Sequence, residues 1–169
     1  MKADKKAAKE RKQEARAYFS GDICDALGQI PAGHHVELRL DPDREVLTIH
    51  SGGKKDGVEI TLPYARIVSF KVEDEVSLVK SGNVFGRAVA GGLLFGSVGA
   101  LVGAASGTGK TDVSWYGTLT YKAKTGEQAQ ITVKELTIGS AKNKSILAIN
   151  FETAVAAIVS RYAESINEL

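Results

Sequence analysis

Residues 34–62 read HHVELRLDPDREVLTIHSGGKKDGVEITL, and this stretch decides the fold class. Val36, Leu38 and Leu40 alternate with polar residues, which is typical of a strand with one buried face. The sequences DPDRE and SGGKKDG each carry the Pro or Gly residues of a turn, so VLTIH and VEITL are predicted to be a second and a third strand. Three strands joined by short turns predict an antiparallel β-meander.

Strand patterns continue on both sides of a glycine-rich segment. Residues 66–79 predict a longer fourth strand before it. After it, SWYGTLTYKAK and QAQITVKEL flank a Thr-Gly pair at 125–126 that predicts a tight hairpin. We expect about four strands before the segment and about three after it. In the long strand, alternation places one set of side chains on a single side: Ile67, Ser69, Lys71 and Glu73.

Both ends of the chain have helical patterns. Residues 4–19 contain strong helix formers without Gly or Pro, and Asp22 is a candidate cap for a short helix ending at Leu27. The order predicts an α+β fold, an antiparallel barrel or bent sheet closed by a C-terminal helix, with a helical region over residues 1–30. The C-terminal helix is expected over residues 151–169, with an apolar face that repeats every three or four residues: Phe151, Val155, Ile158, Tyr162 and Ile166.

The N-terminal segment is basic. Residues 1–16 hold seven Lys/Arg against three Asp/Glu, a net charge of +4, which leaves −2 for the rest because the whole chain carries +2. A basic helix attracts anionic lipid or nucleic acid, although a solvated helix end has the same composition. The candidate contact residues for an anionic surface are Lys2, Lys5, Lys6, Lys9, Arg11, Lys12 and Arg16.

The strand order, with ITLPYARIVSFKVED followed by the helix NFETAVAAIVSRYAESI, resembles the bacterial pleckstrin-homology-like (PH-like) domains. The likeness covers residues 33–168, interrupted by GNVFGRAVAGGLLFGSVGALVGAASGTGK at 82–110. That insert resembles a glycine-rich hydrophobic segment of bacterial and phage proteins. The resemblance implies binding or scaffolding, at membranes or in oligomers, and it transfers no active-site residue.

Small residues recur in the insert with spacings of 4, 4, 3, 4 and 4. On a helix such positions lie within about 100° of one another and form a nearly side-chain-free ridge, a glycine zipper, against which a second backbone can pack. A helical hairpin that bends near Gly96 is the expected form. The ridge consists of Ala88, Gly92, Gly96, Gly99, Gly103 and Gly107, and the other faces would carry Leu93, Leu94, Phe95, Val98, Leu101 and Val102.

Membrane contact of the insert is a second expectation. Residues 88–109 are 22 uncharged residues, of which seven are large apolar residues and seven are glycine. The length suits one crossing of a ~30 Å hydrocarbon core, but a single crossing would split the PH-like domain between two sides of the membrane. Shallow insertion, packing against other copies, and a hairpin buried within the monomer stay open as alternatives.

A relaxed phosphate-binding pattern ends the insert at Gly109, Lys110 and Thr111. A phosphate-binding loop needs a parallel strand before it and a helix that starts at the Lys-Thr pair. The next residues, DVSWYGTLTYKAK, are strand-like instead. Nucleotide binding is therefore an alternative from a different functional class. The preferred interpretation is that these residues form the polar end of the insert.

Candidates for metal or covalent chemistry are few. Cys24 is the single cysteine, so no internal disulfide forms, which fits a reducing compartment. We expect no metal, no cofactor and no catalytic residue. Adjacent histidines on a strand face opposite sides, and the acids after Leu40 suit a turn. A structural role is therefore expected for His34, His35, His50, Asp41, Asp43 and Glu45.

These features predict a non-enzymatic, self-assembling scaffold or binding protein that oligomerises through the insert. We expect it in the cytoplasm, peripherally at the inner face of the cell membrane, with itself as main partner and anionic lipid as a further one. A lipid-binding or membrane-remodelling protein anchored by the insert is the first alternative. Nucleic acid is not an expected partner, because the strands lack an aromatic and basic face. Nucleotide is not expected either, because the residues after the Lys-Thr pair are strand-like.

Overall fold

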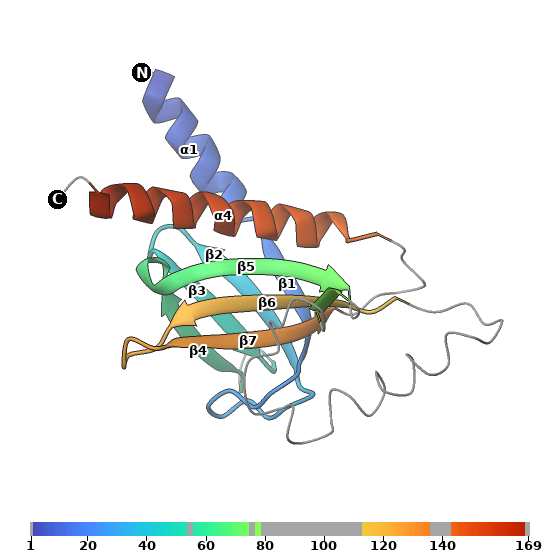
Figure 1. Ribbon diagram of the computed structural model, residues 1–169. Coiled ribbons are helices and arrows are strands. Elements are labelled where there is room, and N and C mark those ends of the chain that lie inside the picture. The colour runs from blue at the N-terminus through green and yellow to red at the C-terminus, as the bar shows by residue number, and fades with distance from the viewer. Residues whose placement is uncertain (1, 54–55, 75–76, 79–112, 136–142, 168–169) are drawn as a thin grey trace.

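A computed structural model describes residues 2–53, 56–74, 77–78, 113–135 and 143–167 (Figure 1). Five strands precede the glycine-rich segment, and two strands and a long helix come after it. The elements are α1 Lys2–Glu14, β1 Tyr18–Ile23, β2 His35–Asp41, β3 Val46–Ser51, β4 Val58–Pro63, a 3-10 helix η1 Tyr64–Arg66, β5 Ile67–Asp74, β6 Trp115–Lys122, β7 Gln128–Glu135 and α4 Ile146–Asn167.

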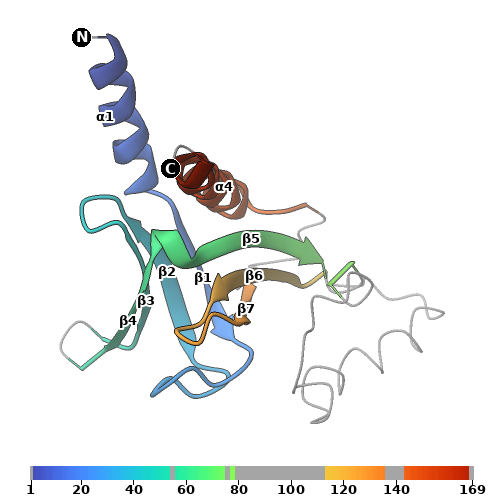
Figure 2. The ribbon, with the colours of Figure 1, turned by 60° about the vertical axis from the view of Figure 1, so that its left-hand side comes forward.

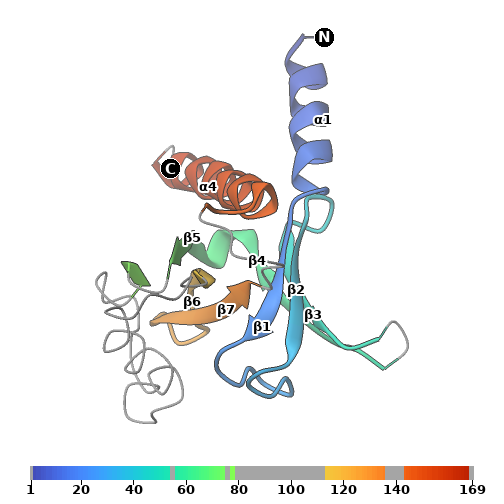
Figure 3. The ribbon, with the colours of Figure 1, turned by 90° about the vertical axis from the view of Figure 1, so that its right-hand side faces the viewer.

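The strands form one antiparallel seven-stranded sheet in the order β4-β3-β2-β1-β7-β6-β5. Strands β1 to β4 are one meander and β5 to β7 a second, and β1 joins them by pairing with β7. The two meanders are steeply inclined to each other, and α4 lies across one end of the space between them (Figures 2 and 3). The predicted α+β class, antiparallel sheet and C-terminal helix are confirmed.

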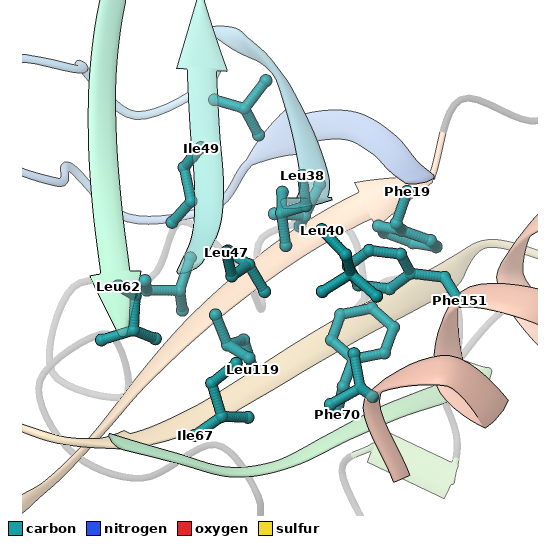
Figure 4. Packing of buried hydrophobic residues seen from close by; sticks show 14 of the residues in the cluster. Phe19, Leu38, Leu40, Leu47, Ile49, Leu62, Ile67, Phe70, Leu119 and Phe151 are labelled. Atoms are coloured by element: carbon teal, nitrogen blue, oxygen red, sulfur yellow. The ribbon is translucent and has the colours of Figure 1, made fainter. Parts of the chain in front are cut away.

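The core fills the space between the two meanders and α4 (Figure 4). Val36, Leu38 and Leu40 are buried on β2, as their alternation predicts. Aromatic rings link three elements: the centroid of Phe70 lies 5.2 Å from that of Phe19 and 4.8 Å from that of Phe151, both in edge-to-face geometry. Such ring pairs add about 0.5–1.5 kcal/mol to the stabilisation from burial itself.

Helix α4 closes the core and covers an edge of the sheet. The hydroxyl oxygen of Ser145 accepts a hydrogen bond from the amide of Ala148 at 3.0 Å and caps the helix. The helix therefore begins at Ile146, before its predicted start at Phe151. Glu152 accepts a hydrogen bond from the amide of Val72 at 3.3 Å and pairs with Lys144 at 3.0 Å. The helix therefore satisfies a backbone donor of the edge strand β5. The predicted face is confirmed, since Phe151, Val155 and Ile158 are fully buried and Tyr162 is half-buried.

The prediction of helices at residues 4–19 and 22–27 was wrong beyond Glu14, because residues 18–23 form β1. The sheet thus begins before residue 33, inside the predicted helical region. Phe19 and Ile23 point into the core, but Gly21 between them on the same face has no side chain, so the apolar alternation is interrupted in the sequence. Gly21 lets β1 approach β7, because a side chain there would overlap the carbonyl of Lys134. The strand is fixed by its two partners rather than by local propensity.

The predicted faces of β5 and the predicted strand counts were also wrong in part. The pairing of β5 with β6 shifts between Ile67 and Ser69, which is a bulge. The bulge moves alternate residues to the other face, so Phe70 and Val72 are buried together with Ile67, and Lys71 is exposed. About four strands were predicted before the glycine-rich segment and about three after it, whereas the described residues hold five and two. The additional strand before the segment is β1, which the sequence pattern placed in the helical region.

The predicted closed barrel is not confirmed. Strands β4 and β5 are the two ends of the sheet, and within the described residues they do not pair with each other. The predicted helical hairpin of residues 82–110 lies outside the described residues.

Candidate functional site

The end of the β5/β6 hairpin is where the glycine-rich segment joins the sheet. Asp74, the last residue of β5, is the cross-strand partner of Trp115, the first residue of β6. Asp74 also accepts hydrogen bonds from the amide and the hydroxyl of Ser77, each at 2.9 Å, and Leu78 is buried. The predicted oligomer or membrane contacts all lie outside the described residues: Ala88, Gly92, Leu93, Leu94, Phe95, Gly96, Val98, Gly99, Leu101, Val102, Gly103 and Gly107.

Three exposed apolar side chains occupy the first turn of α4. Ile146, Leu147 and Ile149 have exposed fractions of 67%, 41% and 44%, and we call them the α4 apolar cluster. Figure 1 shows the start of α4 at the same end of the molecule as the tip of β5. Sequence reading missed the cluster because it placed the start of the helix at Phe151. Neighbouring exposed apolar side chains are typical of an interaction surface.

Helix α4 is the one described helix whose length and hydropathy would suit a membrane span, over Ile146–Glu164. Its buried face, however, packs on the sheet, where Phe151, Val155 and Ile158 have no exposed surface. This pattern is typical of the core helix of a folded domain, since the apolar face already has a protein partner.

The predicted anionic contact residues lie on or just after α1, which projects away from the sheet in all three views (Figures 1–3). Residues 5–13 are all exposed. The Lys6–Glu10 pair, with 3.9 Å between its charged atoms, is an exposed pair of the kind that contributes little stability. Lys2 begins the helix, and the exposed cations along it and after it are Lys5, Lys6, Lys9, Arg11, Lys12 and Arg16.

A cavity of about 360 Å³, here called the α1 cavity, lies where the end of α1 meets the rest of the protein. Four segments that are distant in sequence line it: the last turns of α1, the β2–β3 turn, η1 and α4. The carboxylate of Glu14 pairs with the guanidinium of Arg161 at 2.7 Å, and the hydroxyl of Tyr162 donates to Glu45 at 2.8 Å. The lining residues are Arg11, Glu14, Pro42, Glu45, Tyr64, Arg161 and Tyr162.

Two residues that line this cavity each have a buried polar atom without a hydrogen-bond partner among the described residues: the hydroxyl of Tyr64 and Oε2 of Glu14. Tyr64 is 2% exposed and Glu14 is 5% exposed. Burial first, and the nearby Glu14 charge second, raise the pKa of Tyr64 well above its ordinary value, so its hydroxyl stays protonated and can donate. Sequence reading missed this site because its residues come from segments with no shared motif.

The alternative nucleotide residues Gly109, Lys110 and Thr111 lie outside the described residues. The chain after them is irregular at residues 113–114, and β6 begins at Trp115. Strand β6 pairs antiparallel with both of its neighbours. This order differs from the strand–loop–helix arrangement of a phosphate-binding loop, in which a helix begins at the Lys-Thr pair.

The remaining candidates have structural explanations. Asp41 accepts hydrogen bonds from the amides of Asp43 and Arg44 at 3.2 and 3.0 Å, which confirms the predicted turn. His35 lies 3.5 Å from Asp22 in an exposed pair, and the described residues contain no group of three side chains arranged to hold a metal ion. Cys24 is half-buried, and burial first, with Asp25 second, raises the pKa of its thiol to about 11.

Comparison of the chain with protein-family models, with curated proteins and with solved structures finds no match.

Proposed function

We propose that the protein is a non-enzymatic, self-assembling scaffold, in which a PH-like module presents the glycine-rich segment 82–110 to other copies, at or near a membrane surface. The pairing of Asp74 with Trp115 is the observation that carries this proposal. It means that the segment departs from and returns to neighbouring points of a single hairpin. The sheet can therefore be complete without the segment, which makes it available for another role.

The same pairing argues against a single membrane crossing. Cross-strand partners in an antiparallel pair are about 5 Å apart, whereas one crossing separates its ends by ~30 Å. Two crossings would need about 40 apolar residues, and the uncharged stretch has 22. Shallow insertion, packing against other copies and packing within the monomer remain, and the spacing of small residues favours close packing of backbones.

Two further observations support the proposal. The antiparallel sheet with a C-terminal helix across one end is compatible with the resemblance to PH-like domains. The α4 apolar cluster adds exposed apolar surface at the end of the molecule where the segment is attached (Figure 1). That end and the N-terminus of α1 lie apart in all three views, so the two surfaces can bind different partners (Figures 1–3).

The test is replacement of residues 79–112 by a short Gly/Ser linker. This variant keeps Leu78 and Val113, which pack against the core or near it. We expect circular dichroism and thermal unfolding to resemble those of the full chain, because the paired strands are retained. Light scattering after gel filtration should give an oligomer for the full chain and a monomer for the variant.

Three results would contradict the proposal. The full chain could be a monomer with and without lipid, the variant could retain the oligomeric state, or the variant could unfold. Unfolding would mean that the segment is part of the monomer core. Vesicle co-sedimentation of both proteins distinguishes the scaffold proposal from the lipid-anchored alternative. In that alternative the segment is needed for membrane binding but not for assembly.

The nucleotide-binding alternative has its own test. Calorimetry of the full chain with ATP or GTP and Mg²⁺ should give no binding heat, and Lys110→Ala should leave assembly unchanged. Micromolar binding that disappears in Lys110→Ala would favour the alternative instead.

A further inference from the structure

The α1 cavity brings together polar groups from four segments that are distant in the sequence. Its volume of about 360 Å³ is within the range of small-molecule sites in proteins. Glu14 and Arg161 form an ion pair at its wall, at 2.7 Å, so these two charges compensate each other. The cavity lies on the side of the molecule away from the α4 apolar cluster, and it has no part in the function proposed above.

Two unpartnered atoms in the cavity point to a missing partner. Buried polar groups in native proteins nearly always have a hydrogen-bond partner, in the protein or in a bound molecule. The Tyr64 hydroxyl is a donor, and Oε2 of Glu14 is a carboxylate oxygen that can only accept; neither has a partner among the described residues. A molecule that satisfies both must carry an acceptor for Tyr64 and a donor for Glu14.

The remaining charges of the cavity are one of each sign. Arg11 and Glu45 both line it, and neither belongs to an ion pair within the described residues. Glu45 has a φ of 52°, a left-handed conformation that a non-glycine residue adopts only when its surroundings impose it. In that conformation its carbonyl accepts from the amide of Tyr64 at 2.9 Å and its carboxylate accepts from Tyr162. The strained residue thus contributes its carboxylate to the cavity.

We propose that the α1 cavity binds a zwitterionic small molecule the size of a free amino acid. Its carboxylate would accept from the Tyr64 hydroxyl and from the guanidinium of Arg11. Its ammonium group would donate to Oε2 of Glu14 and to the carboxylate of Glu45. A bound zwitterion adds no net charge to a cavity whose own charges balance, whereas a simple anion would face two carboxylates. Because the ligand contacts α1, α4 and the β2–β3 turn together, it fixes α1 against the sheet.

The probes are the free protein amino acids, tested on the full chain by thermal shift and then by isothermal calorimetry. We expect at least one to raise the unfolding temperature in a concentration-dependent way and to give a saturable binding heat. The matched probes for that amino acid are its N-acetyl derivative and its amide, each of which lacks one charge. Both should bind at least about tenfold more weakly, since each loses a charged hydrogen bond.

The decisive variant is Tyr64→Phe, which removes only the unpartnered hydroxyl. It should leave the ligand-free protein at least as stable as the original and weaken binding about tenfold or more. Arg11→Gln should weaken binding without changing stability, because Arg11 is exposed. Lys124→Gln, which removes the same charge in the β6–β7 turn, is the matched control and should bind normally.

The proposal is overturned by any of three results. No amino acid binds at millimolar concentration, which would leave the cavity to ordered water. The singly charged derivatives bind as well as the free amino acid, which would make it a site for a simple anion or cation. Binding is unchanged in both Tyr64→Phe and Arg11→Gln, which would place the ligand elsewhere.

Discussion

Asp74 and Trp115 are cross-strand partners at the end of the β5/β6 hairpin, although 40 residues separate them in the sequence. The two strands thus form a normal hairpin whose connection has been replaced by the glycine-rich segment. A long connection weakens closure of a hairpin only slowly with length, so the fold tolerates it. The scaffold proposal therefore depends on one local feature of the sheet, the pairing of Asp74 with Trp115.

Gly99→Leu tests the glycine ridge directly. Leucine raises helix propensity by about 1 kcal/mol, so a loss of assembly could not be blamed on a weaker helix. We expect the larger side chain to hold two backbones apart and to shift the assembly towards smaller species in light scattering. Val98→Leu lies off the ridge and should assemble normally. Unfolding of the whole chain by Gly99→Leu would show that the ridge packs inside the monomer.

Gly117→Ala probes the aromatic core. A methyl group at this position would lie 2.6 Å from ring atoms of both Phe19 and Phe70, inside van der Waals contact. Overpacking of this kind lowers the free energy of unfolding by about 1–3 kcal/mol. Urea denaturation should show this change, while Gly53→Ala, where nothing lies within 4 Å, serves as the control. Equal midpoints for the two variants would be inconsistent with the packing around Gly117.

Removal of residues 2–10 tests the basic surface of α1 while keeping Arg11 and Glu14 of the α1 cavity. Each Lys or Arg near an anionic membrane contributes about 1 kcal/mol, and salt screens the attraction. We expect weaker co-sedimentation with anionic vesicles at low salt and an unchanged unfolding temperature, because residues 5–13 are exposed. Neutral vesicles are the control. If both proteins sediment equally with anionic vesicles, α1 is not the contact surface.

Cys24 should react slowly with alkylating reagents at neutral pH. Burial raises the pKa of its thiol from the ordinary 9.0 to about 11, so the reactive thiolate is scarce below that range. The rate of iodoacetamide labelling of the folded protein should be half-maximal near pH 11, whereas that of the unfolded chain should be half-maximal near pH 9.0. A labelling rate of the folded protein that is half-maximal at pH 9.0, as for an unburied thiol, would contradict this assignment.

The same raised pKa has a consequence for stability. The folded state holds the Cys24 proton more tightly than the unfolded state does. Its contribution is therefore fully present below pH 9.0 and is lost as the pH rises towards about 11. A Cys24→Ser variant should lose less stability over this interval, which denaturation at several pH values can measure.

Elements with a strong hydrophobic period were predictable from the amino-acid sequence. The alternation at Val36, Leu38 and Leu40 and the helical repeat at Phe151, Val155 and Ile158 each follow from a single buried face, so local pattern and burial agree. The turns at 42–45 and 125–126 were equally predictable, because Pro, Asp and Gly restrict the backbone locally. The composition of the glycine-rich segment is also known from the sequence alone.

Features that depend on partners far apart in the chain became visible only in the folded protein. Strand β1 exists because Gly21 allows β7 to approach, and the buried face of β5 is set by a bulge against β6. The α1 cavity likewise forms where Glu14, Tyr64 and Arg161 meet from three elements. None of these residues has a local sequence signal for its role. Strand pairing, bulges and cavities depend on interactions between segments, rather than on the properties of one segment.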